Sequence, residues 1–222
     1  MKQIYPDLWL LQPGEKAGFA YLLKRKDGNI LMGRSSDISA QVPLLEEHGG
    51  VAQIYIHDRH MAKAGMAKNT EALGLGIICS AIEAKACHKT VAIAEKLPME
   101  STQILPDLKI VPTPGHTQGA FSHIWENGNH RYLFIGDTLV PVEGEWKFWV
   151  SKKEYCADDR KHAAVTTRRF RCDSVKLVRL QALRLDEYYE ERERQLTVTR
   201  AGCSIRQVVG GIDVFPMWRK SV

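Results

Sequence analysis

The feature that most constrains the fold is a regular alternation of short apolar runs and helix-like segments over the first two thirds of the chain. The apolar runs Val51–Ile56 and Gly76–Cys79 are short, and the segment Ala62–Leu73 between them is rich in Ala, Met and Lys. Short apolar runs bounded by turn signals indicate strands, and residues with high helix propensity indicate a helix. Strands that alternate with helices predict a layered α/β domain.

The other expected elements follow from turn and cap signals. Asp37 is a candidate cap for a helix that ends at Glu47, although Pro43 requires this helix to start late. Ser80 is a candidate cap for a helix through Ala86. The remaining expected elements are a strand segment Ile4–Leu11 with a Pro-Asp turn inside it, a hairpin of Gly18–Leu23 and Ile30–Met32, a strand Leu108–Val111, and a hairpin of Phe121–Trp125 and Arg131–Ile135.

Length and composition bound the class of protein. A chain of 222 residues forms one large α/β domain or two small ones. No run of about 18 apolar residues is present, and the N-terminus has no long apolar stretch of the signal-peptide kind. The five cysteines form no CxxC pair, which favours free thiols in a reducing compartment. We therefore expect a cytoplasmic protein without a membrane span.

The last third of the chain differs from the rest in charge. Residues 1–150 carry 15 basic and 16 acidic residues, whereas residues 151–222 carry 16 and 10. A basic segment can bind nucleic acid, but here the basic residues lie among acidic ones, which is typical of a solvated helix face. The segment Lys176–Arg194 has a rough apolar stripe typical of a helix, and Val208–Phe215 is a candidate final strand.

Three polar clusters follow predicted strands. They are His57–His60, Pro114–Thr117 and Gly136–Thr138. Each places an imidazole or a carboxylate at the end of a strand, and these groups are the ligands that zinc, iron and manganese prefer. Because strands of one sheet deliver their carboxyl ends to one edge, side chains from separate clusters can converge on one site.

Two of these clusters resemble segments of a known family. Pro112–Gly119 reads PTPGHTQG and resembles the PTPGHTxG segment of the metallo-β-lactamase superfamily, and Tyr132–Thr138 reads YLFIGDT and resembles its LFxGDT segment. The resemblance covers roughly residues 1–150 and implies a four-layer αββα sandwich. It also implies that His116 is a ligand of the first metal and that Asp137 bridges two metals.

The third cluster departs from the superfamily's HxHxDH signature in either of two registers. If His60 is the second His, Asp58 replaces the first, Ala62 replaces the Asp and Lys63 replaces the last His. Lys63 would then direct an ammonium group toward the lost second metal and balance the charge of Asp137. The alternative, a solvated helix residue, is equally open for Lys63.

In the second register His57 is the first His. Arg59, Met61 and Ala62 then occupy the other three signature positions. The upstream Asp of the superfamily's LIDTG segment is also replaced, because ILMGRS stands there, and no final His ligand is evident near the C-terminus. Both registers therefore predict a site that holds one metal ion at most.

Ligand counting favours a hydrolase-like protein with one zinc or iron ion. His60, His116 and Asp137, with His57 or Asp58, could supply the three protein ligands of a catalytic metal. Asp137 and Lys63 are the candidate catalytic residues, and the substrate would be a small ester, thioester or amide. The alternative is a non-catalytic member of the fold that binds a small molecule as a scaffold, with no metal. A nucleic-acid partner is the weakest hypothesis, and self-association stays open.

The resemblance ends near Trp149, where the arginine content rises. Eleven of the fifteen arginines lie in residues 151–222. We therefore divide the chain into a core, residues 1–150, and an atypical basic segment, residues 151–222, which completes the same domain or leaves it incomplete. Divergence and a change of reading frame both explain such a segment, and the second predicts early proteolysis from about Tyr155 onward.

Overall fold

A computed structural model describes residues 1–11, 19–33, 37–128, 130–142, 145–148, 204–205 and 213–216. The chain divides into two compact units. The first comprises Met1–Met99 with the short segment Gly119–Phe121, and the second comprises Glu100–Gln118 and the described residues from Ser122 onward. The N-terminal elements and the short segment Gly119–Phe121 thus belong together although about twenty residues of the second unit separate them in sequence.

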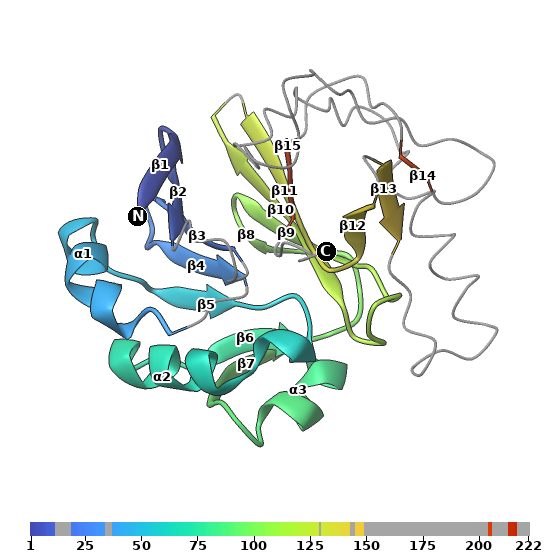
Figure 1. Ribbon diagram of the computed structural model, residues 1–222, viewed down its shortest axis with the longest axis horizontal. Helices are drawn as coiled ribbons and strands as arrows, with labels where there is room; N and C mark the ends of the chain where they lie inside the picture. Colours follow the sequence, from blue (N-terminus) through green and yellow to red (C-terminus); the bar gives the residue numbers. More distant parts are fainter. Residues whose placement is uncertain are drawn as a thin grey trace. The chain divides into compact units, whose positions relative to one another are not determined.

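The first unit is built on a seven-stranded sheet whose strands follow one another in chain order. Its first four strands pair antiparallel, and β4 to β7 pair parallel. Parallel neighbours need a crossover, and α1, α2 and α3 supply one each (Figure 1). The elements are β1 Lys2–Tyr5, β2 Leu8–Leu11, β3 Ala20–Leu23, β4 Ile30–Gly33, α1 Val42–Glu47, β5 Gln53–Tyr55, α2 Ala64–Leu73, β6 Ile77–Ser80, α3 Ala81–Cys87 and β7 Ile93–Leu97.

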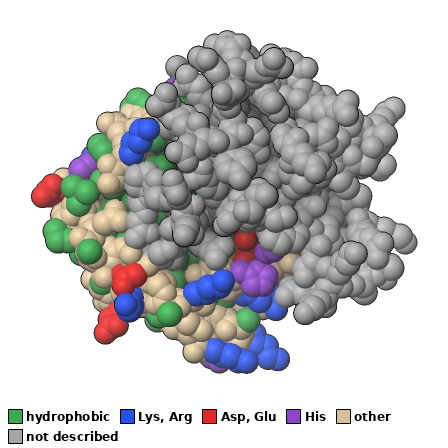
Figure 2. All heavy atoms as spheres, viewed as in Figure 1, with side chains coloured by type: hydrophobic (Ala, Val, Ile, Leu, Met, Phe, Trp, Pro, Cys, Tyr) green, Lys and Arg blue, Asp and Glu red, His purple; other side chains and the backbone are tan. Residues whose placement is uncertain are grey.

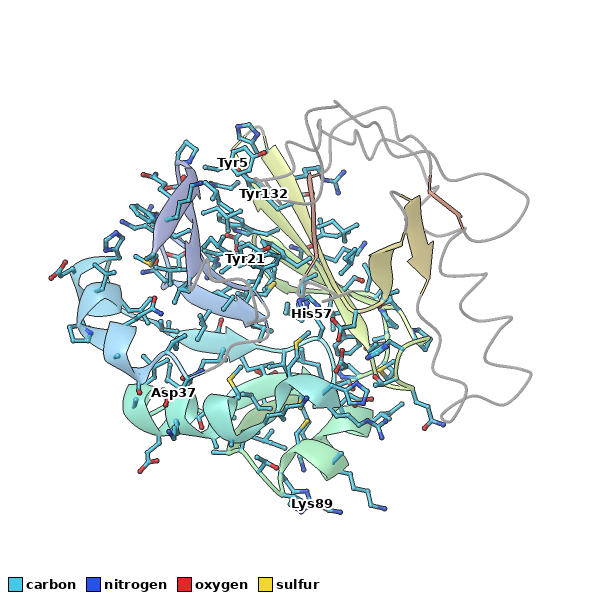
Figure 3. The ribbon with its side chains drawn as sticks, viewed as in Figure 1. Tyr5, Tyr21, Asp37, His57, Lys89 and Tyr132 are labelled. Atoms are coloured by element: carbon cyan, nitrogen blue, oxygen red, sulfur yellow. The ribbon has the colours of Figure 1, made fainter. Side chains whose placement is uncertain are left out.

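The core of this unit lies along its central strands. Every residue of β3, β4 and β6 is buried, as expected for strands covered on both faces. Figure 3 places Tyr21 among these side chains, whereas Lys89 lies at the outer edge of the unit. Burial raises the pKa of the Tyr21 hydroxyl well above its usual range.

The sequence signals for the helices of this unit are correct in part. Ser80 caps α3 as expected, since its Oγ accepts from Glu83 N at 3.1 Å. The prediction that Asp37 caps a long helix is wrong. The helix begins only at Val42, with Pro43 in its first turn, where a missing N–H costs nothing. Asp37 Oδ1 instead accepts from Ser39 N, ahead of a 3₁₀ turn Ser39–Gln41.

The second unit contains a five-stranded sheet and a small three-stranded sheet. The first has the order β15-β11-β10-β9-β8 and the second the order β12-β13-β14. The strand β15 pairs parallel with β11 and agrees in part with the expected final strand Val208–Phe215. The elements are β8 Thr102–Leu105, β9 Leu108–Pro112, β10 Phe121–Asn127, β11 His130–Gly136, β12 Leu139–Val142, β13 Glu145–Phe148, β14 Ser204–Ile205 and β15 Asp213–Pro216.

Several expectations fall outside the described residues. The helix Lys176–Arg194 and nearly all of the basic segment 151–222 lie there, so the division at residue 150 stays a prediction.

Both cysteines of the described part, Cys79 and Cys87, are buried free thiols. Over the described ranges, none of the helices has the length and apolar character needed to cross a bilayer. On the face seen in Figure 2, Lys and Arg side chains lie among Asp and Glu side chains.

Candidate metal site

The first group of candidate ligands follows β5. His57 is buried, and its main chain and ring both bond to Phe121: Phe121 N donates to the His57 carbonyl at 2.9 Å, and His57 Nδ1 lies 2.9 Å from the Phe121 carbonyl. Because a carbonyl only accepts, Nδ1 carries the ring proton and Nε2 keeps its lone pair. Burial lowers the pKa of His57 to about 4, against a smaller opposite effect of the Phe121 hydrogen bond, so the ring is neutral at physiological pH.

Asp58 and His60 are held in one tight turn. Asp58 is buried and caps the 3₁₀ turn Arg59–Met61, where its Oδ1 accepts from His60 N at 2.7 Å. His60 Nδ1 lies 3.5 Å from the same oxygen, and 40% of the His60 side chain is exposed. The helix expected from Ala62 therefore begins at Ala64, because this turn comes first. The turn brings an imidazole and a carboxylate together at the end of one strand.

The other signature positions carry no ligand of the family type in either register. Met61 and Ala62 are buried, and Met61 Sδ accepts from His57 N at 3.4 Å. Lys63 is exposed and precedes α2. A thioether and a methyl group are therefore enclosed at positions where the superfamily signature has polar ligands.

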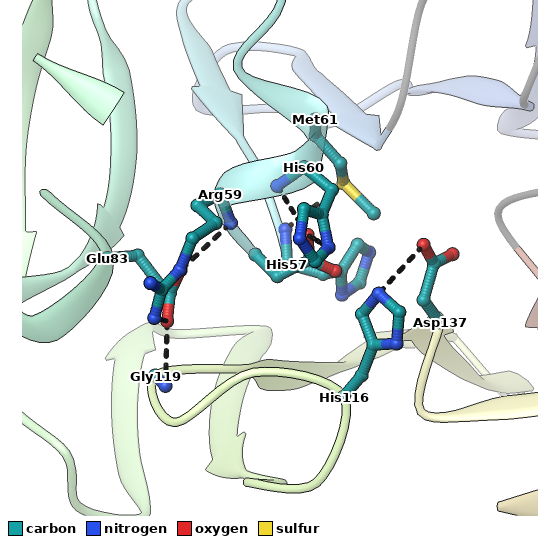
Figure 4. Close-up of polar contacts among 9 residues, drawn as sticks. His57, Arg59, His60, Met61, Glu83, His116, Gly119 and Asp137 are labelled. Carbon is teal, nitrogen blue, oxygen red and sulfur yellow. Dashed lines mark hydrogen bonds and ion pairs between the residues drawn. The ribbon is translucent and has the colours of Figure 1, made fainter. Parts of the chain in front are cut away.

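The second group of candidate ligands belongs to the second unit. His116 and Asp137 are both buried, and His116 Nε2 lies 3.6 Å from Asp137 Oδ2 (Figure 4). His116 stands in the loop after β9, in which Gly115 N donates to the Thr117 carbonyl at 3.2 Å. Asp137 directly follows β11, after Gly136 with a φ of 59°. The predicted pairing of an imidazole from one strand end and a carboxylate from another is thus present within this unit.

Hydrogen bonds between hydroxyl groups connect the residues that follow β9 and β11. Thr113 Oγ1 lies 3.1 Å from Ser122 Oγ, and Thr138 Oγ1 donates to Thr113 Oγ1 at 3.3 Å. All three side chains are buried. Buried hydroxyls that bond to one another rigidify the loops they join, here the loops that carry His116 and Asp137.

One buried carboxylate near the first group was not expected from the sequence. Glu83, in the first turn of α3, accepts from Arg59 and from Gly119 N (Figure 4). The spacing Ser80-x-x-Glu83 is a sequence signal, because it matches a capping box and marks Glu83 as a polar residue at a helix start. That signal gives no sign that the carboxylate bonds to loop residues far away in the chain.

The donor chemistry fits a transition metal. Asp58 and His60 of the first unit and His116 of the second can each offer one ligand atom, a carboxylate oxygen or an imidazole nitrogen. Two imidazoles and one carboxylate are a known donor set for catalytic zinc and for non-haem iron. His57 directly precedes Asp58 in sequence, and Asp137 lies beside His116 within the second unit.

Comparisons by sequence found no relatives. No family model matches the chain, and no curated protein sequence matches it. Solved structures do match. The metallo-β-lactamase FIM-1 of Pseudomonas aeruginosa, in a mono-zinc form, aligns with a TM-score of 0.58 at 17% identity over 77% of this chain and 82% of that one.

Two further solved structures give the same result. A metallo-β-lactamase of Cronobacter sakazakii described by its HARLDQ motif aligns with a TM-score of 0.57 at 16% identity, over 79% of this chain and 77% of that one. The metallo-β-lactamase MIM-1 of Novosphingobium pentaromativorans aligns with a TM-score of 0.56 at 16% identity, over 76% of this chain and 70% of that one. At such identities the likeness concerns the fold.

Proposed function

Since the chain has the metallo-β-lactamase fold, an α/β sandwich, we propose that it is a hydrolase-like protein with a single metal ion held by Asp58, His60 and His116. The donor set of these loops carries the proposal: one carboxylate and two imidazoles, each in a loop that follows a strand of a metallo-hydrolase-like fold. When bound, such an ion lowers the pKa of a coordinated water and polarises a substrate carbonyl. The proposed substrates are small esters, thioesters or amides.

The protein's own residues have distinct roles in this proposal. Asp58 holds the His60 backbone through its Oδ1 and offers one carboxylate oxygen as a ligand atom. Asp137, whose Oδ2 lies 3.6 Å from His116 Nε2, fixes the His116 ring and can accept a proton at a carboxylate oxygen. A buried carboxylate beside a ligating imidazole is the usual arrangement that orients such a ring.

The sequence of the first loop matches the register in which His57 is the first His, and the proposed ligands Asp58 and His60 then stand between the signature positions. The HARLDQ motif of the Cronobacter protein has His first and Arg third, and His57–Ala62 reads HDRHMA, with His and Arg at the same places. The fifth and sixth positions differ, since Met61 and Ala62 stand there. In this proposal His57 helps to bind substrate, whereas Lys63 takes no part.

A second candidate function is a non-catalytic binding scaffold. The observation that favours it is the enclosure of Met61 and Ala62 at signature positions, together with the Met61–His57 contact. Apolar side chains in those places reduce the number of polar groups available for catalysis. On this alternative the protein binds a small molecule without a metal.

Metal analysis and a hydrolase assay separate the two. Purified full-length protein should contain close to one equivalent of zinc or iron, and His116→Ala should lose it. His88→Ala is the matched control, since His88 is exposed at the end of α3. A panel of chromogenic esters and thioesters should be hydrolysed by wild type and His88→Ala and not by His116→Ala. Metal-free wild type whose thermal stability ignores chelator would support the scaffold instead.

A further inference from the structure

The Glu83 carboxylate is enclosed by donors. Glu83 is 0% exposed. Its Oε2 accepts from Arg59 N at 3.0 Å and from Arg59 Nε at 2.6 Å, and its Oε1 accepts from Arg59 Nη2 at 3.1 Å and from Gly119 N at 2.7 Å (Figure 4). An ionised carboxylate has about four acceptor sites. These four bonds therefore use its whole capacity inside the first unit.

Two of the four donors are main-chain N–H groups. The Glu83 carboxylate therefore holds the backbone of Arg59 and Gly119 as well as the Arg59 side chain. Arg59 stands between Asp58 and His60 in sequence, so its N–H fixes the turn that carries both proposed ligands. Gly119 follows His116 by three residues. Three peptide steps span at most about 11 Å, so anchoring Gly119 limits how far His116 can lie from the Glu83 carboxylate.

The site of the Gly119 anchor leaves no room for a side chain. A Cβ at Gly119 would lie 2.6 Å from Glu83 Oε1 and would also overlap Ser80 Oγ. Gly119 is not among the glycines with positive φ, so the need for glycine comes from close approach to Glu83. Gly119 and the start of α3 are thus in close contact inside the first unit.

We propose that Glu83 is a positioning residue for the metal ligands. It is not itself a ligand, because its acceptor sites are occupied by Arg59 and Gly119. Inside the first unit it anchors at one point the turn of Asp58 and His60 and Gly119, the residue at which the chain returns from the loop of His116. This inference rests on the proposed function, since the anchoring matters for catalysis only if these residues share an ion.

The test compares Glu83→Ala and Glu83→Gln with Asn29→Ala in the full-length protein. Asn29 is a buried hydrogen-bonding residue of the same unit, at 5% exposure, whose side chain bonds to the backbone of Arg25, His48 and Gly50. Its loss should destabilise the fold without changing the ligand loops. The readouts are the Co²⁺ dissociation constant, from the visible absorption of the bound ion, and amide hydrogen exchange at Gly119.

Glu83→Ala should raise the Co²⁺ dissociation constant about 10- to 100-fold, as is usual when the partner of a ligand is removed. Glu83→Gln should fall between Glu83→Ala and wild type, since one acceptor oxygen remains. Asn29→Ala should bind Co²⁺ as wild type does. A wild-type dissociation constant in Glu83→Ala, or an equal loss in Asn29→Ala, would overturn the inference while leaving the proposed metal site intact.

Wild type that binds no Co²⁺ would instead refute the proposed function. Hydrogen exchange then decides about Glu83 alone. Faster exchange at Gly119 in Glu83→Ala, but not in Asn29→Ala, would support the anchoring of the loops. Unchanged exchange at Gly119 in Glu83→Ala would overturn that as well.

Discussion

Replacing Gly119 by alanine adds one methyl group where Gly119 contacts the start of α3. The new Cβ would lie 2.6 Å from Glu83 Oε1 and would overlap Ser80 Oγ. Neither neighbour can move easily. Ser80 Oγ accepts from Glu83 N as the cap of α3, and the Glu83 carboxylate is bonded to Arg59 at three donors.

Two costs contribute to the expected loss of stability. Inserting a methyl group into a filled space costs roughly 1–3 kcal/mol. Relief of the overlap also lengthens the 2.7 Å bond from Gly119 N to Glu83 Oε1, and a hydrogen bond to a charged group contributes roughly 1.5–3 kcal/mol. We expect the free energy of unfolding to fall by about 3 kcal/mol in Gly119→Ala.

Urea denaturation followed by circular dichroism measures this loss, and Gly128→Ala is the matched control. Gly128 has a φ of 59° and nothing within 4 Å of an added Cβ, so alanine there costs only backbone strain, about 1 kcal/mol. If Gly119→Ala costs no more than Gly128→Ala, the close contact with Glu83 is not a constraint and the reasoning fails.

Three further predictions concern the stability of each unit. Asn29→Ala should lower the free energy of unfolding by about 2–4 kcal/mol in urea, because its side chain bonds to three main-chain groups; a loss below about 1 kcal/mol would contradict this. Since the folded pKa of His57 is about 4 and the unfolded value about 6.5, the unfolded chain binds the proton first and stability falls as the pH drops below about 6.5, by roughly 2 kcal/mol at pH 5. His57→Gln should remove that part of the pH dependence, and an unchanged dependence would refute it. Trp125→Phe should cost about 2 kcal/mol, because it loses the bond from Nε1 to Asp107 Oδ2 at 3.0 Å, and a neutral substitution would show that this bond does not matter.

Much of the first unit follows from local sequence signals. The hairpins, the buried central strands and the Ser80 cap were predictable because apolar runs, turn residues and caps act over a few residues. The strand Ile93–Leu97 was missed because three of its five residues are exposed and two of these, Glu95 and Lys96, are charged. An edge strand that exposes charges lacks the apolar run by which a buried strand is recognised.

The strand β8 was also missed, although the chain offers a signal for it. Pro106-Asp107 forms the turn between β8 and β9, as Pro6-Asp7 does between β1 and β2. In both places the Asp carbonyl then accepts a main-chain N–H from a third strand or its neighbouring loop, Lys24 N at Asp7 and Glu126 N at Asp107, each at 2.8 Å. Comparison of the two Pro-Asp sites would have identified the second hairpin.

The polar residues of the candidate site, His57, Asp58, His60, His116 and Asp137, were named from the sequence because each follows a predicted strand, and their role in metal binding stays a prediction. The bond from Gly119 N to Glu83 Oε1 was not expected, since it joins residues 36 positions apart in the chain. Long-range bonds of this kind depend on how the strands are arranged, which no local pattern records.

The most direct test of a shared metal site is a zinc titration of full-length protein followed through the ring resonances of its histidines by NMR. We predict that one equivalent of Zn²⁺ shifts the rings of His60 and His116 together, in slow exchange, while the ring of exposed His88 stays unchanged. Substitution of Asp58 by alanine should abolish both shifts. If the His116 ring ignores zinc, or if it shifts while His60 does not, the two loops do not share an ion and the account is wrong.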